Sequence, residues 1–270
     1  MKKITATEKQ KDKITPSALH TWNVWLAVLH ALQGVAVLLL SATKLFPIQT
    51  SYLTADPVAS ELAGHPILGS ATRHVFDINL AYLVAAFFFM SAIAHALIAS
   101  MCRHQYEADL KRKINKARWI EYAVSASTMM VAIAVLAGVA DLSTLLLIFA
   151  LDVIMNLTGL AMEVYNQGKS KPNWLVFVIG GLAGIVPWIV LAVYFWGSNV
   201  YGSGDIPVFV YWIFASIFLF FSSFAINMYL QYKKVGKWSD YLYGERMYMV
   251  LSLTAKTALA WQIFAGALRP

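Results

Sequence analysis

The segment Tyr243–Leu268 reads YGERMYMVLSLTAKTALAWQIFAGAL, and Lys256 stands near its middle with no charged residue within nine positions on either side. An ammonium group at that depth of an apolar helix costs about 3 kcal/mol even on lenient membrane-insertion scales. An ionisable residue in a membrane span is therefore a candidate functional residue that needs a partner. A lysine amine can also form a Schiff base with an aldehyde ligand, so Lys256 is a candidate attachment point for such a ligand.

The composition is that of a membrane protein. Of the 270 residues, 59% are hydrophobic and only 13% are charged, about half the charged fraction of a soluble domain. Seven segments are long and apolar enough to cross a bilayer, which takes about 20 residues each. Lipid-facing backbone must satisfy its own hydrogen bonds, and no segment alternates like a barrel strand. We therefore predict an all-α membrane protein with a single seven-helix bundle over 1–270. The predicted spans are 21–43, 78–101, 117–139, 142–164, 174–197, 207–232 and 243–268.

The basic residues that give the chain its net charge of +7 gather in alternate connections between the spans. Such connections stay in the cytoplasm, so the pattern predicts a cytoplasmic N-terminus, an extracellular C-terminus and multi-pass insertion in the cell membrane. Topology thereby explains the charge, and we expect no nucleic-acid partner. The predicted cytoplasmic residues are Lys2, Lys3, Lys9, Lys11, Lys13, Arg103, Lys111, Arg112, Lys113, Lys116, Arg118, Lys169, Lys171, Lys233, Lys234, Lys237 and Arg246. Those on the other side are Lys44, Arg73 and Arg269.

Two segments outside the spans have an expected character of their own. Residues 1–17 are expected to form a basic tail near anionic lipid headgroups. Residues 45–77 form a long extracellular loop, and a connection of that length usually has structure or function of its own. Within it, Ile48–Leu53 is consistent with a short strand. In the outer loop before the fourth span, Asp141 is placed to cap the helix that follows.

The most direct partner for Lys256 is Glu121 in the third span. Counted from the cytoplasmic ends, Glu121 lies only about 5 Å beyond Arg118, whereas Lys256 lies about 15 Å beyond Arg246. The two depths agree if the third helix begins near Leu110 and projects past the membrane. We interpret Glu121 as the counter-charge that keeps the amine protonated. A structural ion pair without any ligand is the alternative.

Further polar side chains are placed to share a layer with this pair. Ser125 and Ser252 each lie one helical turn from a member of the pair, on the same helix face. His30 and Gln33 share a face of the first span, and His95 lies at a similar depth in the second. The three side chains are expected to form one polar cluster. Hydrogen bonding between helices, without any proton transfer, is the simpler alternative for each histidine.

The fourth span carries two acidic residues for which we expect other roles. Glu163 lies near the cytoplasmic end, where solvation is the simplest interpretation. Asp152 lies deeper, and we expect it to bond a neighbouring helix through Asn156 or a serine.

The fifth and sixth spans are suited to clamping a flat polyene. Pro187 frees a backbone carbonyl and bends the fifth helix just before Trp188. Aromatic residues of the sixth span, Phe221 among them, face this bend, and Met155 of the fourth span is a soft filler for the same slot. Most aromatic residues of these spans are nevertheless expected to face lipid or to pack between helices. The glycines that precede the bend and leave room are Gly180, Gly181 and Gly184.

Four of the spans carry short motifs around these polar residues. The motifs are Leu29-His30-Ala-Leu-Gln33-Gly34, Ser91-Ala-Ile-Ala-His95, Arg118-Trp-Ile-Glu121-Tyr122, and Leu251-Ser252-Leu-Thr-Ala-Lys256 with Ala258-Leu-Ala-Trp261. They resemble those of the heliorhodopsins. The resemblance covers all seven spans, and the orientation inferred from charge is the trait that separates this family from other microbial rhodopsins.

The resemblance implies a cofactor, all-trans retinal, bound covalently as a Schiff base to Lys256. It implies Glu121 as the counter-ion of that Schiff base, with Ser252 close by. The further candidate contacts of the retinal are Ser125, Tyr122, Met155, Trp188 and Phe221.

The resemblance also implies that His30 and His95 lie on the cytoplasmic side, where they receive the released proton. With Gln33 they are the candidate proton-accepting cluster. The first outside loop of the family packs in a homodimer, which would explain the length of 45–77.

The predicted function is that of a photoreceptor, not an enzyme. Outward proton pumps among microbial rhodopsins carry a second helix-3 carboxylate and an acid one turn before the lysine. Those positions hold Ala132 and Ser252 here, so the pumping machinery is incomplete. We expect light to isomerise the retinal and the proton to move to the cytoplasmic polar cluster. An unknown cytoplasmic partner would then read the change through the basic loops 103–118 and 231–246.

Two other functions remain open at this point. A light-gated or light-driven ion (proton) transporter needs only one polar path. A seven-helix transporter without chromophore would use Lys256 and Glu121 as its coupling pair, but the chain lacks the paired broken half-helices of inverted-repeat carriers. No set of metal ligands is expected in any of these functions.

Overall fold

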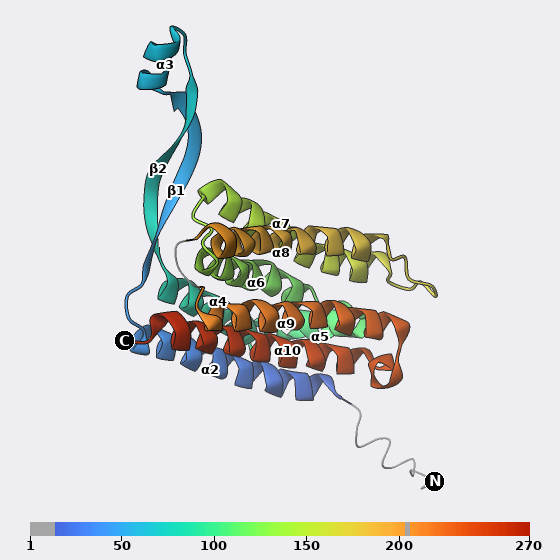
Figure 1. Ribbon diagram of the computed structural model, residues 1–270. Coiled ribbons are helices and arrows are strands. Elements are labelled where there is room, and N and C mark those ends of the chain that lie inside the picture. The colour runs from blue at the N-terminus through green and yellow to red at the C-terminus, as the bar shows by residue number, and fades with distance from the viewer. Residues whose placement is uncertain (1–13, 203–205) are drawn as a thin grey trace.

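Seven long helices lie side by side in residues 14–202 and 206–270, the part of the chain that this computed structural model describes (Figure 1). Six of them, all except α10, are long and apolar enough to cross a membrane. Helix α10 is less apolar because Arg246, Lys256 and Gln262 lie within it. In chain order the seven are α2 (Pro16–Leu40), α4 (Leu80–Ala99), α6 (Lys116–Leu136), α7 (Leu142–Tyr165), α8 (Leu175–Tyr201), α9 (Val208–Lys233) and α10 (Tyr241–Ile263).

The ends of these helices lie within four residues of the predicted ones, with two exceptions. Helix α2 begins at Pro16, because Thr15 accepts a hydrogen bond from the backbone N–H of Ala18 and proline suits a first helical turn. The chain after α10 continues as a π-helical turn, η2 (Phe264–Leu268). The predicted basic tail is therefore shorter at its C-terminal end, and its residues 1–13 lie outside the described residues.

A separate short helix precedes α6. Helix α5 (Arg103–Lys111) ends in a turn where Lys113 adopts a left-handed backbone conformation, with φ of 59°. Asn115 then caps α6, since its side-chain oxygen accepts from the backbone N–H of Arg118 at 3.1 Å. The prediction that the third helix begins near Leu110 is therefore wrong, because the left-handed turn interrupts the helix.

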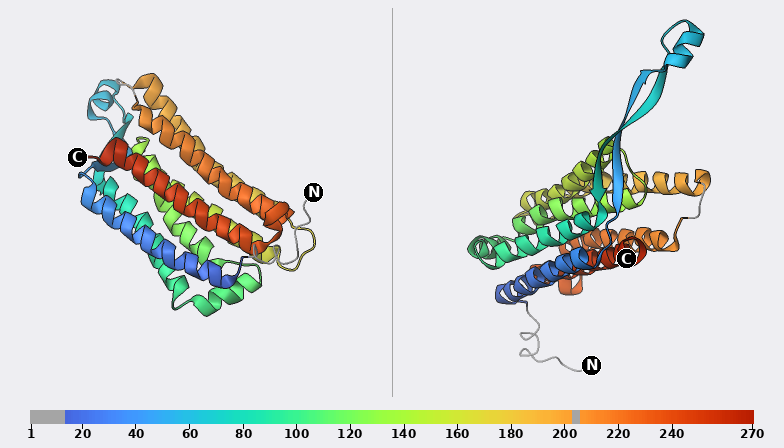
Figure 2. Two further views of the ribbon diagram at one scale, coloured as in Figure 1. Left: turned by 90° about the horizontal axis from the view of Figure 1, so that it is seen from below. Right: turned by 90° about the vertical axis from the view of Figure 1, so that its left-hand side faces the viewer.

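The predicted outer loop 45–77 is an ordered β-hairpin. Strands β1 (Leu45–Ala55) and β2 (Leu68–Asn79) pair antiparallel, and the short helix α3 (Pro57–Ala63) forms the tip. The predicted short strand is part of the longer β1, because cross-strand hydrogen bonds extend along the whole hairpin. The hairpin runs across the helix axes and projects beyond the bundle (Figures 1 and 2).

The root of the hairpin is tied to the connection between α6 and α7. Ile48 is fully buried, and the backbone N–H of Gln49 donates to the carbonyl of Ala140 at 2.9 Å. Asp141 caps α7 as predicted, accepting from the backbone N–H of Thr144 at 2.9 Å. The C-terminus also lies at this end, which we call the hairpin end, and α2 begins at the opposite end, near α5 (Figure 1). We call that opposite end the α5 end.

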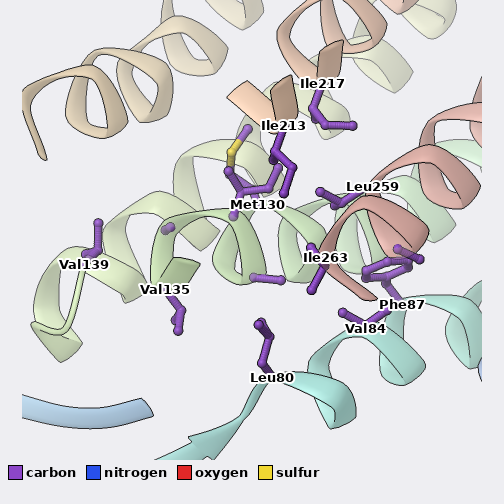
Figure 3. Packing of buried hydrophobic residues seen from close by; sticks show 14 of the residues in the cluster. Leu80, Val84, Phe87, Met130, Val135, Val139, Ile213, Ile217, Leu259 and Ile263 are labelled. Carbon is purple, nitrogen blue, oxygen red and sulfur yellow. The ribbon is translucent and has the colours of Figure 1, made fainter. Parts of the chain in front are cut away.

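Helices that follow one another in the chain pack against one another: α2 on α4, α6 on α7, α7 on α8, and α9 on α10. Contacts of α4 with α6 and of α10 with α2 complete the arrangement. The main apolar core fills the hairpin end and combines the first turns of α4 and α7 and the last turns of α6 and α10 with side chains of α2, α8 and α9. Figure 3 shows Leu80 and Val84 of α4 on one side of this core and Leu259 and Ile263 of α10 on another.

Candidate functional site

Lys256 and Glu121 lie together inside the bundle. The amine Nζ is 3.1 Å from Oε1 of Glu121, and each side chain is 4% exposed. Nζ also donates to Ser252 Oγ, one turn earlier on α10, at 2.8 Å. Ser125 Oγ and Ser91 Oγ donate to the same carboxylate oxygen at 2.6 and 2.5 Å. The carboxylate thus accepts from three side chains at a single oxygen, and these bonds favour its ionised form.

The common depth of the two residues follows from how α6 and α10 begin. Asn115, before the first turn of α6, donates through Nδ2 to Glu245 Oε2 at 2.6 Å, so the two helices start at one level. From that level Glu121 lies about 9 Å along its helix and Lys256 about 17 Å. The lysine side chain leans back toward the start of α10 by about one turn, and this takes up most of the difference.

Tyr122 packs beside the amine. The centroid of its ring is 5.3 Å from Nζ of Lys256, within the range of a cation–π contact. Its hydroxyl donates to the backbone carbonyl of Tyr248 at 2.9 Å, which ties α6 to α10 next to the ion pair.

An apolar cavity of about 160 Å³ opens beside Lys256. Lys256 and Ser252 form part of its wall, and Asp152 is the one acidic side chain on it among the described residues. Apart from Asn156 and Thr158, the rest of the wall is aromatic, aliphatic and thioether surface, mostly from α6, α7, α8 and α9, which suits a flat apolar ligand. The predicted ligand contacts that line this cavity are Tyr122, Met155 and Phe221.

Trp188 does not line the cavity but supports its wall. Its ring lies against Phe221 of α9 at 5.5 Å between centroids, and against Phe214 and Phe218 at 5.5 and 5.1 Å. Of the neighbouring glycines, Gly180 and Gly181 line the cavity, as the sequence suggested, and Gly184 does not. A β-carbon at Gly184 would clash with Met155, so this glycine permits α8 to approach α7 closely.

The structure brings His30 and His95 together and places Gln33 elsewhere. The two imidazole rings stack with centroids 5.8 Å apart, and both side chains are buried. Nδ1 of His95 lies 2.7 Å from Oδ1 of Asn23. Gln33 instead accepts from the indole N–H of Trp261 at 3.3 Å. A side chain one turn away on the same face can therefore contact a different helix, and the three predicted residues do not form one cluster.

The two acidic residues of α7 have different surroundings. Asp152 accepts from Ser127 Oγ of α6 at 3.0 Å and from Asn156 Nδ2 at 3.1 Å, as the sequence suggested. The interpretation of Glu163 as a solvated residue is wrong. It is 3% exposed and accepts from Arg118 Nη2 at 2.5 Å, because the turn before α6 and the start of α10 cover it.

Some polar residues around the site were not predicted. Ser91 precedes His95 by one turn in an apolar span, and that spacing was the available signal for its contact with Glu121. Asn23 and Glu245 gave little signal, since each lies near the expected end of a span. Arg118 was counted among the topology-setting charges, yet its side chain is 6% exposed.

A bundle of membrane helices with a buried lysine–carboxylate pair beside an apolar cavity defines the class of retinal-binding rhodopsins. A family model described as Heliorhodopsin matches residues 19–268, and the chain belongs to that family. It is therefore a multi-pass membrane protein of a retinal-binding, light-sensing family rather than of an enzyme family. A search of curated proteins found no match.

Proposed function

We propose that this chain is a photoreceptor in which Lys256 holds all-trans retinal covalently and Glu121 is the counter-ion. The observation that carries the proposal is the buried amine of Lys256, which forms part of the cavity wall and contacts a carboxylate at 3.1 Å. No ion is pumped in this account, and the output is a change on the cytoplasmic surface.

The residues fit such a cofactor. The amine is available at the wall of an apolar cavity, and Tyr122, Met155 and Phe221 offer it flat or soft contact surface. When bound, retinal supplies absorption of visible light and an isomerisation that light drives. Trp188 packs against the ring of Phe221 and so stabilises the cavity wall.

The ionised carboxylate of Glu121 keeps Nζ of Lys256 protonated in the dark. A carboxylate with hydrogen bonds from Ser91, Ser125 and the amine remains ionised, and its negative charge stabilises the positive charge on nitrogen. Ser252 accepts from the same nitrogen and fixes its position. These contacts set how easily the proton leaves after illumination.

The released proton moves toward the α5 end. On that side of the pair lies buried His95, whose ring stacks on that of His30. On the other side Ser127 and Asp152 hydrogen-bond to each other, and α6 then continues with Met130, Ala132 and Ile133 inside the apolar core. A proton that can leave and return on one side alone is not pumped, and this favours sensing over transport.

We further propose that α10 is the seventh span and that the α5 end faces the cytoplasm. Helix α10 packs against α9 and α2 along the bundle, as the other spans do. The basic connections 103–118 and 231–246 lie at the α5 end, as the positive-inside rule requires for a cytoplasmic face. These connections are the proposed surface for a cytoplasmic partner.

A homodimer is also part of the proposal. The hairpin projects beyond the bundle, and its apolar side chains Tyr52, Leu53 and Phe76 are 48%, 68% and 43% exposed. Coverage by a second copy would remove this surface from water.

Photocurrents distinguish sensing from the rival function, ion transport. Membranes that contain the retinal-loaded chain are illuminated under voltage clamp, with Lys256→Ala as the light-insensitive control. We expect a visible absorption band in the wild type and no current above the control. A light-dependent current that is lost in Lys256→Ala would establish transport instead.

A further inference from the structure

Arg118 shares its single charge with two buried carboxylates. Its Nη2 atom donates to Glu163 Oε1 at 2.5 Å and lies 3.2 Å from Glu245 Oε1. The side chains of all three are at most 6% exposed. Asn115 joins them, with its backbone N–H donating to Glu163 at 2.8 Å and its side-chain amide to Glu245 at 2.6 Å. We call Arg118, Glu163 and Glu245 the arginine cluster.

The arginine cluster has one negative charge too many when both carboxylates are ionised. A buried charge without a partner is unfavourable, and one bound proton removes the excess. Among the described residues, Arg118 is the only cation in contact with the two carboxylates. The other titratable groups that face the cluster are Tyr106 of α5, His95 of α4, Glu121 and Tyr122 of α6, Tyr232 of α9, and Tyr241 and Tyr248 of α10. None of these tyrosines supplies a positive charge, so a proton is the natural neutralising ligand.

A small polar cavity connects the cluster to the counter-ion. It has a volume of about 20 Å³, and its wall includes Arg118 and Glu245 together with Glu121 and His95. That volume admits about one water molecule. Several buried polar atoms of its lining residues have no hydrogen-bond partner in the described part of the chain. They are His95 Nε2, the Tyr106 hydroxyl, and Arg118 Nε and Nη1. These atoms supply the donors and acceptors that one bridging water needs.

We propose that the arginine cluster takes up the proton released from Lys256. Glu163 and Glu245 share this proton. The N–H bond at Nζ breaks, an O–H bond forms on one of the two carboxylates, and a water in the small cavity relays the proton past His95. Glu121 remains ionised, and the cluster loses its excess negative charge. This proposal rests on the proposed function, because it assigns the destination of the same proton.

The cluster is a better final acceptor than its neighbours. A proton on Oε1 of Glu121 would have to displace the hydroxyl donors Ser91 and Ser125 from that oxygen. A proton on His95 would place a positive charge in a buried site that already faces Arg118 across the small cavity. The cluster, which has one negative charge in excess, becomes neutral in net charge when it takes the proton.

Light-minus-dark infrared spectra test this assignment. In wild-type membranes loaded with retinal, we expect a protonated-carboxyl C=O band to appear as the visible band bleaches, and to shift when glutamate alone is ¹³C-labelled. The label separates glutamate from Asp152 and requires no variant. The band should vanish or shift in Glu163→Gln and in Glu245→Gln, and remain in Glu107→Gln, an exposed control on α5.

Each result decides between clear alternatives. A band that does not shift with labelled glutamate, or that persists unchanged in both cluster variants, would overturn the assignment of the proton to the arginine cluster. Absence of any visible band in the wild type would contradict the proposed function itself, which is a different failure. Acid titration of retinal-free membranes gives a second measurement. The infrared band of one protonated glutamate should appear as the pH falls in the wild type and in Glu107→Gln, and should be absent in Glu245→Gln.

Discussion

The two ends of the bundle differ in how they are held together. At the hairpin end, helices meet through apolar side chains such as Leu80, Ile133 and Leu259, all within one continuous core. At the α5 end, apolar clusters around Leu26 and Tyr248 surround buried charges and amides. Lys256 and Glu121 lie where the two kinds of interior meet. The polar side chains in contact with Glu121 thus continue toward the α5 end, whereas on the other side the interior beyond Ser127 and Asp152 is apolar.

We expect the largest loss of stability from a substitution at the Lys256–Glu121 pair, where the two kinds of interior meet. Glu121→Gln removes one partner of a buried ion pair and leaves the Lys256 amine without a counter-charge. Loss of one partner from such a pair costs about 3–5 kcal/mol. We expect a large drop in the thermal midpoint, together with loss of the visible band at neutral pH. Glu107→Gln, which alters an exposed ion pair on α5, should leave both unchanged. An unaltered band in Glu121→Gln would show that Glu121 is not the counter-ion.

The hairpin end should respond to loss of volume and not to loss of polarity. Leu259 is fully buried in the apolar core, so Leu259→Ala should lower the free energy of unfolding by about 2–5 kcal/mol. The position of the visible band should stay the same, because no polar contact of Lys256 changes. Leu182→Ala, at a position 63% exposed on α8, is the control with little effect. A shifted band in Leu259→Ala would mean that the two ends are not independent.

A smaller change at the α5 end should do the reverse. Ser91→Ala removes one of three donors to Glu121 and should cost about 1 kcal/mol in stability. It should nevertheless shift the visible band, because it changes the charge distribution facing Nζ. The comparison variant is Ser100→Ala, which removes an exposed serine at the end of the same helix. Equal spectra for the two variants would show that Ser91 has no influence on the pair.

The smallest expected effect concerns the helix cap at the hairpin end. The backbone N–H of Thr144 donates to the Asp141 carboxylate and holds its pKa below the usual value. The contribution to stability is therefore present above the ordinary aspartate pKa and is lost as the pH falls through the lowered value. Asp141→Asn keeps a capping side chain without this titration, so its thermal midpoint should vary less with acid than that of the wild type. Identical acid dependence in both proteins would show that the cap contributes nothing.

Much of this arrangement could be predicted from the sequence because charge in an apolar span is rare. Lys256 and Glu121 stand out for that reason, and the spans follow from their length and hydropathy. The start of the third helix was predicted wrongly, since the left-handed turn at Lys113 has no strong sequence signal. The hairpin was missed because both of its faces are largely exposed, so its strands lack the alternating apolar pattern.

The polar contacts were predictable only in part, and the reason is geometric. Ser125 and Ser252 lie one turn from the pair on the same helices, so spacing alone predicted them. Gln33 also shares a face with His30, yet its longer side chain bonds Trp261. Contacts between helices that are distant in sequence, such as Arg118 with Glu163, depend on rotations of the helices that no local pattern specifies.

The most direct test of the central claim is the visible spectrum of membranes that contain the chain and all-trans retinal, beside Lys256→Ala. We predict a visible band in the wild type that is absent from the variant, because Lys256→Ala removes the proposed attachment point. A band that persists in Lys256→Ala, or no band in the wild type, would contradict covalent attachment at Lys256.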